Sequence, residues 1–163
     1  MALSACNVVS NPSFETGVLA PWRASAVNVA TISNGTTAYS GDYYLNLQTA
    51  YGNSANSISQ GIRHLKPHTE YKFSVQAQLA PSAVEFCGVS VSMGGRNATA
   101  SIASVDISNF GVWTEVTGSY VPKSENEILS IFAYCDSEDS SDTGNVLFDD
   151  ISLTADDCAY GLA

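Results

Sequence analysis

The sequence predicts a single all-β domain spanning residues 1–163, a jelly-roll β-sandwich of two antiparallel sheets. Helical periodicity is almost absent, whereas short runs of alternating apolar and polar residues recur between clusters of Gly, Pro, Asn and Ser. The 163 residues are enough to bury one core, and they contain no linker or internal repeat. About eight strands or more, with turn signals between them, are typical of an antiparallel sandwich.

Each strand is expected where apolar and polar residues alternate. The clearest is Tyr71–Leu79, in which the odd-numbered positions are apolar and the even-numbered positions are polar, so that one face meets the core. Residues 87–93 repeat the alternation and end at the turn signal Gly94-Gly95. Further strands are expected in the opening stretch and at residues 27–33, 43–49, 57–62, 113–121, 128–135 and 146–153.

The charge of the chain limits its partners. Six Lys and Arg residues against sixteen Asp and Glu residues give a net charge of −10, and no basic run occurs. Nucleic acid and anionic membrane surfaces both require a positive footprint, so neither is an expected partner. No run of about eighteen apolar residues occurs, so no membrane span is expected. Neutral ligands, cationic ligands and divalent metals remain open, and we expect a monomer or weak oligomer.

Cysteine usage predicts an oxidising compartment. The chain has four cysteines, Cys6, Cys87, Cys135 and Cys158. They are too widely spaced for a CxxC zinc or redox motif, so two disulfides are expected, in one of three pairings. If the first and last strands are adjacent, Cys6 pairs with Cys158, and Cys87 pairs with Cys135. Sequons at Asn34 and Asn97 also suit a secreted, extracellular glycoprotein. Residues 1–7 lack the features of a signal peptide, so we expect any such peptide to have been removed.

Two adjacent carboxylates, Asp149 and Asp150, interrupt the apolar strand at residues 146–153. Adjacent strand residues point to opposite faces, so at most one of the two is simply solvated if one face is core. Phe148 and Ile151 cannot both face inward in a regular strand, and a bulge at the two aspartates would reconcile them. The alternative is an edge strand whose exposed carboxylates prevent aggregation.

Several motifs occur in an informative order. They are "NPSFETG" at residues 11–17 followed by Pro21-Trp22, "YSGDYYLNL" at 39–47, "SISQGIRHLKPHTEYKFSVQAQ" at 57–78, "WTEV" at 113–116 and "LFDDISL" at 147–153. Over nearly the whole chain this succession resembles the family 4 and family 9 type of carbohydrate-binding modules, including small secreted members found in fungi. The resemblance implies a jelly roll with a structural calcium and a sugar-binding surface on the concave sheet or at the loop tips. Where the family usually has Gly in a turn this chain has His68, so the geometry of that turn is in question.

The resemblance also implies which residues bind calcium. Glu15 of "NPSFETG" and Asp149 of "LFDDISL" would supply carboxylates, and backbone carbonyls around Gly41 and Asp42 would fill further positions. A buried carboxylate is costly unless it is paired or bound to metal, and Ca²⁺ takes six to eight oxygen ligands.

Sugar contacts are expected on outward strand positions and at loop tips. Gln76 and Gln78 point away from the core on their strand, and Phe132 and Tyr134 have the outward parity on theirs, together with Ser130. Rings would stack on the C–H face of a sugar while amides pair with its hydroxyls. Among the loop aromatics, Tyr51 in "TAYGNSAN" is the preferred contact. The alternative is that Phe132 packs under a loop and the amides are ordinary solvated surface.

Catalysis is not expected. The chain has no E-x-D-x-x-E glucanase motif, no H-E-x-x-H, no G-x-S-x-G and no phosphate loop. Pro67 between His64 and His68 argues against a helical zinc pair, and the acidic loop at residues 135–145 lacks the EF-hand pattern. The sequence therefore predicts a non-catalytic polysaccharide- or glycan-binding module. A cell-wall or virulence-associated interaction protein without sugar binding is the first alternative, and a lyase or hydrolase on the same sandwich is the second.

Overall fold

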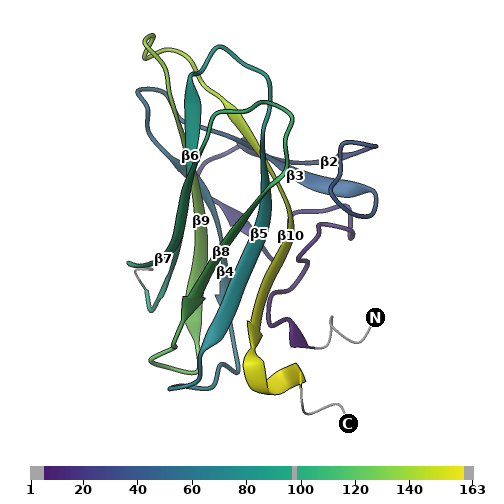
Figure 1. The fold of residues 1–163 in the computed structure, drawn as a ribbon, viewed down its shortest axis with the longest axis vertical. Coiled ribbons are helices and arrows are strands. Elements are labelled where there is room, and N and C mark those ends of the chain that lie inside the picture. Colours follow the sequence, from purple (N-terminus) through teal and green to yellow (C-terminus); the bar gives the residue numbers. More distant parts are fainter. Residues whose placement is uncertain (1–5, 97–98, 160–163) are drawn as a thin grey trace.

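The computed structural model describes residues 6–96 and 99–159, which form two five-stranded antiparallel sheets packed face to face (Figure 1). The first sheet has the order β1 (Arg23–Ala24), β4 (Asn56–Ile62), β9 (Glu127–Asp136), β6 (Phe86–Gly94) and β7 (Ala100–Ile107). The second sheet has the order β2 (Ala30–Asn34), β3 (Tyr43–Gln48), β10 (Asn145–Ala155), β5 (Tyr71–Leu79) and β8 (Thr114–Tyr120). A short 3-10 helix, η2 (Asp156–Ala159), follows β10. The described part of the chain has no α-helix, and none of its helices could cross a membrane.

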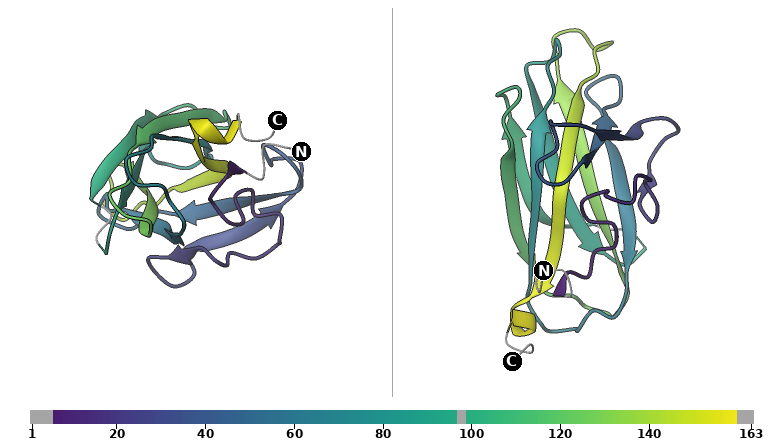
Figure 2. Two further views of the ribbon diagram at one scale, coloured as in Figure 1. Left: turned by 90° about the horizontal axis from the view of Figure 1, so that it is seen from below. Right: turned by 90° about the vertical axis from the view of Figure 1, so that its right-hand side faces the viewer.

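The predicted all-β sandwich is confirmed, and β5 has the predicted bounds. The sequence did not predict β1 or β7. β7 reads "ASIASVDI", whose many small residues favour strands only weakly. Residues 6–12 form no strand, but they run along the second half of β10, where Val8 N–H donates to the Leu153 carbonyl (3.1 Å) and Ile151 N–H to the Pro12 carbonyl (2.9 Å). The start and end of the described chain therefore lie side by side, as Figure 2 also shows.

Inward side chains of both sheets fill one core. Apart from the buried Gln78, the buried residues of β5 follow the predicted alternation, and its Tyr71, Phe73 and Val75 are at most 2 % exposed. Trp22 is also buried, and its ring lies 6.4 Å from that of Phe14, as expected for a core residue. Trp113, in contrast, is only half buried. Its indole N–H donates to the Thr37 carbonyl, and its ring packs against Tyr39 of the same loop.

The predicted bulge in β10 is confirmed. The register of β10 against β5 shifts between Asp149 and Ser152, so β10 carries one extra residue there. Asp150 takes up the irregularity with a φ of 49°. Phe148 and Ile151 are consequently both buried, at 0 % and 1 % exposure.

His68, which stands where the resembling family usually has glycine, adopts a backbone conformation that favours glycine. Its φ of 66° lies in the left-handed region, which is costly for a residue with a Cβ.

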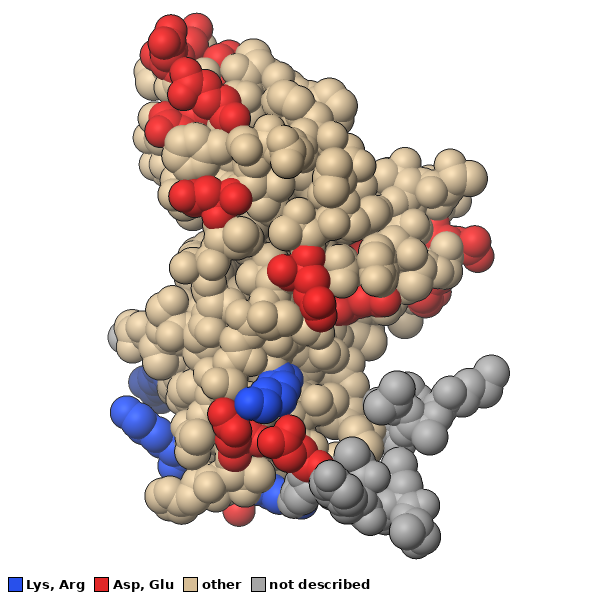
Figure 3. All heavy atoms as spheres, in the orientation of Figure 1, with Lys and Arg blue, Asp and Glu red and all other residues tan. Residues whose placement is uncertain are grey.

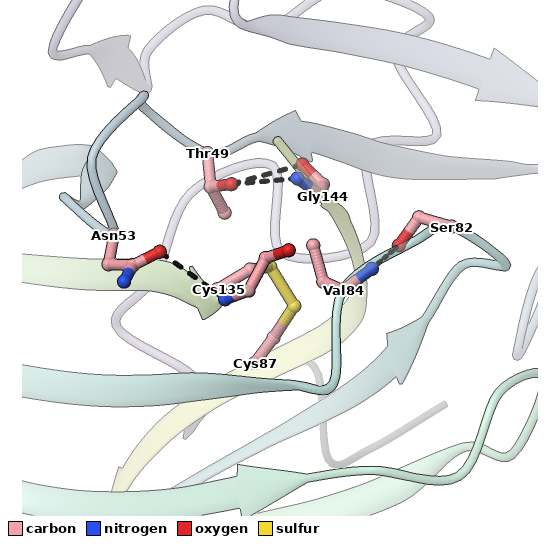
Figure 4. Close-up of a disulfide and its surroundings, with 8 residues drawn as sticks. Thr49, Asn53, Ser82, Val84, Cys87, Cys135 and Gly144 are labelled. Carbon is pink, nitrogen blue, oxygen red and sulfur yellow. Dashed lines mark hydrogen bonds between the residues drawn. A yellow bond between two sulfur atoms is a disulfide. The ribbon is translucent and has the colours of Figure 1, made fainter. Parts of the chain in front are cut away.

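Both expected disulfides form. Cys6–Cys158 joins the start of the described chain to η2, with a Cα–Cα distance of 5.7 Å. Cys87–Cys135 joins directly paired residues of β6 and β9 inside the sandwich (Figure 4).

The two sheets also meet along one edge, where β8 approaches β7. A Cβ built on Gly118 of β8 would lie 2.0 Å from the Ile102 carbonyl oxygen. Only glycine allows this close approach of the two backbones.

Candidate functional site

The outward side of the first sheet carries small polar residues around two rings. On β9, Phe132 lies between Ser57 of β4 and Ser90 of β6. In the next outward row, Ser130, which is itself only 7 % exposed, lies between Ser59 and Ser92. We call this surface the open face; its outward residues are Ser57, Ser59, Gly88, Ser90, Ser92, Ser130, Phe132 and Tyr134. Because most of these side chains are a hydroxymethyl or a hydrogen, they leave room above the sheet for a ligand that fits against both rings.

One end of the open face is aromatic. The Tyr134 ring lies across Gly88, where a Cβ would be 2.2 Å from its Cε1 atom. Phe86 meets the same ring edge to face, with centroids 6.3 Å apart and an interplanar angle of 81°. Cys87 and Cys135, the sequence neighbours of these aromatics, point inward and are bonded to each other. The disulfide therefore holds together the two strands that carry the Phe86–Tyr134 ring pair.

Tyr51 lies at the same end of the sandwich as the ring pair. Its loop is tied to the loop after β9, because Gly52 N–H donates to the Ser140 carbonyl (2.8 Å) and Asn53 Nδ2 donates to Asp136 Oδ1 (3.1 Å). Asp136 directly opposes Phe86 in the sheet. Tyr51 is 70 % exposed and free to contact a ligand there. Beneath these loops the Thr49 hydroxyl bonds the Gly144 backbone above the Cys87–Cys135 disulfide (Figure 4).

Gln76 and Gln78 do not join this site. They lie on β5, in the second sheet, whereas Phe132 and Tyr134 lie on β9, in the first. Outward residues of the two sheets point to opposite sides of the sandwich, so the expectation that these amides lie beside the rings is wrong. Gln78 is moreover only 7 % exposed.

A hollow of about 730 Å³ lies at the other end of the open face. Its lining includes Arg23, Ser59, Gly61, Arg63, His64 and Ile128. Ile128 and Tyr134 are six residues apart on β9, a separation of about 20 Å at the usual rise of a strand. The open face thus runs from the ring pair to this hollow. Strand alternation predicted that Ser130 of β9 points outward, but Ser57, Ser59 and Arg23 were not among the predicted site residues, although "SIS" in β4 shows the same alternation.

The two carboxylates expected to bind calcium meet at one turn. Glu15 Oε1 accepts hydrogen bonds from the N–H groups of Asp42 (3.0 Å) and Tyr43 (3.1 Å). Asp149 Oδ2 accepts one from Ser40 N–H in the same turn (3.1 Å). Both carboxylates therefore hold the connection between β2 and β3, and they do so on the side of the second sheet.

The environment of Asp149 favours a proton or a cation. The residue is 0 % exposed, and burial raises the pKa of its carboxyl from 3.8 to about 6, although N–H groups of Ser40 and Asp150 lower it. Within residues 6–96 and 99–159 its partners are backbone N–H groups, and no Lys or Arg pairs with it. Ser13 and Ser40 hydroxyls donate to the neighbouring Asp150.

The 39–43 turn was expected to direct the backbone carbonyls around Gly41 and Asp42 toward the calcium site, but the structure shows a different arrangement. The Asp42 carbonyl accepts a hydrogen bond from Gly35 N–H (2.9 Å), and it is the turn's N–H groups that meet Glu15. A Cβ on Gly41, whose φ is 60°, would lie 2.2 Å from Glu15 Oε1, so glycine is needed there. In the described ranges no three His, Cys, Asp or Glu side chains converge as a metal-binding group. Calcium here would need hydroxyl or carbonyl oxygens beside the carboxylates, all of which are hard ligands of the type it prefers.

Of the two sequons, Asn34 is exposed at the end of β2, where an oligosaccharide would extend into solvent. Asn97 lies outside the described residues.

Comparisons with known proteins found one matching family and several similar structures. Residues 6–139 match the model of CBM_4_9, described as a carbohydrate binding domain. No curated protein sequence matches the chain. Among solved structures, the module TmCBM61 in complex with β-1,4-galactotriose has a TM-score of 0.67 at 17 % identity, covering 92 % of this chain and 99 % of that one.

Two xylan-associated structures are also similar. The CBM22-2 xylan-binding domain of Paenibacillus barcinonensis Xyn10C has a TM-score of 0.64 at 20 % identity, covering 88 % of this chain and 97 % of that one. The CBM22-1 and GH10 modules of Clostridium thermocellum xylanase 10B, complexed with xylohexaose, give 0.63 at 21 % identity, covering 92 % of this chain and 29 % of that one. At these identities the likeness establishes the jelly-roll fold alone.

Proposed function

Because the chain belongs to the CBM_4_9 family of carbohydrate binding domains, we propose that it binds a neutral β-1,4-linked polysaccharide, without catalysis, on the open face of its first sheet. The observation that carries the proposal is the Phe86–Tyr134 ring pair, held over Gly88 beside rows of serine hydroxyls.

The chemistry of the open face suits a sugar chain. An aromatic ring offers an apolar surface to the C–H groups of a pyranose, and the serine hydroxyls can both donate to and accept from its hydroxyl groups. Charged residues are absent from the middle rows, where Ser57, Phe132 and Ser90 follow one another across three strands. A neutral polymer therefore meets no unpaired charge there.

The similar structures suggest which polymers to try first. One of them holds β-1,4-galactotriose, and others are described as xylan-binding or hold xylohexaose. Xylan and β-1,4-galactan both have β-1,4-linked backbones, and the open face, about 20 Å long, has room for several such sugars.

Gel retardation in a panel of soluble polysaccharides tests the proposal. The native protein should be retarded selectively by one polymer, relative to a non-binding control protein. Phe132→Ala should reduce the retardation, whereas Gln76→Ala on the opposite sheet should leave it unchanged. Absence of retardation by every polymer would contradict sugar binding and favour an interaction protein on the same scaffold.

We also propose that calcium binds where Glu15 and Asp149 meet the 39–43 turn. The support is the fully buried Asp149 carboxylate, which has no cationic side-chain partner among the described residues, and the oxygen-rich surroundings of Ser13, Ser40 and Asp150. When bound, the ion would neutralise Asp149 and tie the turn to β10. Because this corner belongs to the second sheet, calcium would stabilise the fold without touching the sugar.

The proposed setting is extracellular. The two disulfides indicate an oxidising compartment, as expected for a secreted protein.

A further inference from the structure

The 730 Å³ hollow, at the end of the open face away from the Phe86–Tyr134 ring pair, is lined by cationic side chains. The chain has only six Lys and Arg residues against sixteen acidic ones, yet two of the six, Arg23 and Arg63, line this hollow together with His64. Its lining contains no Asp or Glu. In a protein of net charge −10 this is a local reversal of sign.

Both guanidinium groups are available to a ligand. Arg23 lies on β1 directly opposite Ser59, and Arg63 follows the end of β4. Both are exposed, and within the described ranges neither forms an ion pair or a side-chain hydrogen bond. An arginine without a protein partner can give its whole planar fork of N–H donors to a carboxylate.

The opposite end of the open face has the opposite charge. Asp106 opposes Gly88 beneath the Tyr134 ring, and Asp136 opposes Phe86. In the view of Figure 3 the upper end carries Asp and Glu and no Lys or Arg, whereas the visible Lys and Arg lie near the lower end, where further Asp and Glu are also present. An anionic group on a bound chain would thus be repelled at the ring pair and attracted at the hollow, which fixes the direction of the chain.

We propose that the hollow binds the carboxylate of a uronic acid in a polysaccharide whose neutral sugars occupy the ring pair. The proposal rests on the function proposed above and specifies its substrate class. The Arg23 and Arg63 guanidinium groups bind the carboxylate, the Ser59 hydroxyl bonds a sugar hydroxyl, and the half-buried Ile128 contacts the apolar face of the sugar. The uronic acid is either a branch on a neutral backbone or a residue of an acidic backbone.

Calorimetric titration of the folded protein tests the proposal. The first probe is a xylo-oligosaccharide with one glucuronic acid branch, compared with the same oligosaccharide after reduction of its carboxyl group to an alcohol. At low salt the acidic form should bind about tenfold more tightly. Added salt should remove this preference while leaving the affinity for the reduced form unchanged. An oligogalacturonate, with carboxylates in its backbone, is the second probe and identifies the source of the uronate.

Variants separate this inference from the function on which it rests. Arg23→Gln and Arg63→Gln should each weaken binding of the acidic form to the level of the neutral one, without weakening the neutral one. Lys72→Gln on the second sheet removes an exposed cation elsewhere and should change neither affinity. Equal binding of the acidic and reduced forms, or a preference that survives both arginine substitutions, would overturn the uronate site while leaving neutral sugar binding intact. Failure of every oligosaccharide to bind would overturn both.

Discussion

Gly88→Ala should weaken sugar binding although Gly88 itself is covered by Tyr134. The added Cβ would lie 2.2 Å from Cε1 and 2.5 Å from Cζ of the Tyr134 ring, and ordinary contact begins at 3.4 Å. The ring must therefore retreat by at least 1.2 Å, the difference between 3.4 and 2.2 Å. Gly88 does not have a positive φ, so alanine is compatible with its backbone and the ring is the part that moves.

The size of the effect follows from the contact area. If the displaced ring loses about 50 Å² of apolar contact with a pyranose, the loss at 25 cal/mol per Å² is about 1.3 kcal/mol, or roughly tenfold in Kd. Titration calorimetry with a neutral β-1,4-linked oligosaccharide measures this change, and a melting curve checks that the variant is folded.

Gly95→Ala is the matched control. Gly95 directly follows β6, the strand that carries Gly88, and a Cβ there meets nothing within 4 Å. The Gly95→Ala variant should therefore bind the oligosaccharide with the affinity of the native protein. Native affinity in a folded Gly88→Ala variant would refute the role of the ring pair. The sugar-binding site would then have to lie on the opposite sheet or at the loop tips.

Four further results are expected. A chelator should lower the Tm of the native protein, and Glu15→Ala should abolish that sensitivity, because calcium binding to the folded state stabilises it; an unchanged melting curve would count against the ion. In chelator, the raised pKa of Asp149, about 6 against 3.8, means that the folded state holds the proton more tightly. Stability relative to Asp149→Asn should therefore fall by roughly 3 kcal/mol as pH rises from about 3 to about 7, measured by urea unfolding; a flat difference would contradict this. Replacing Cys87 and Cys135 by Ser opens a link between residues 48 apart and should cost about 4 kcal/mol of unfolding free energy in the entropic description, and a loss below 1 kcal/mol would contradict it. Gly118→Ala should destabilise the fold by about 3 kcal/mol or prevent folding, because its Cβ would meet a backbone oxygen; a native Tm would show that β7 and β8 are further apart.

Much of the fold was predictable because its strands alternate clearly. The bulge in β10 followed from the parity of Phe148 and Ile151, which no regular strand can bury together. The disulfide pairing followed once the two ends of the chain were taken to be adjacent. β7 was missed because "ASIASVDI" has few of the branched and aromatic residues that mark a strand.

The site was less predictable for a physical reason. Alternation shows which residues of a strand point away from the core, but a sandwich has two outer faces and alternation does not say which one. Gln76 and Tyr134 were both correctly expected to point outward, yet they lie on different sheets. Sheet membership depends on pairing between distant strands, which local patterns do not encode.

The roles of Gly88 and Arg23 also could not be predicted from local sequence patterns. Gly88 is informative only because Tyr134 lies across it, and Arg23 only because β1 places it opposite Ser59. Neither contact involves residues near in sequence, so neither is visible before the chain is folded.

The most direct test of the central claim is a titration of isotope-labelled protein with a neutral β-1,4-linked oligosaccharide, followed by amide chemical shifts in NMR spectra. The account predicts that the largest changes occur on β4, β6 and β9, around Ser57, Ser90 and Phe132, and that β5 is unaffected. Changes centred on Gln76 and its neighbours in the second sheet, with none on the open face, would contradict it.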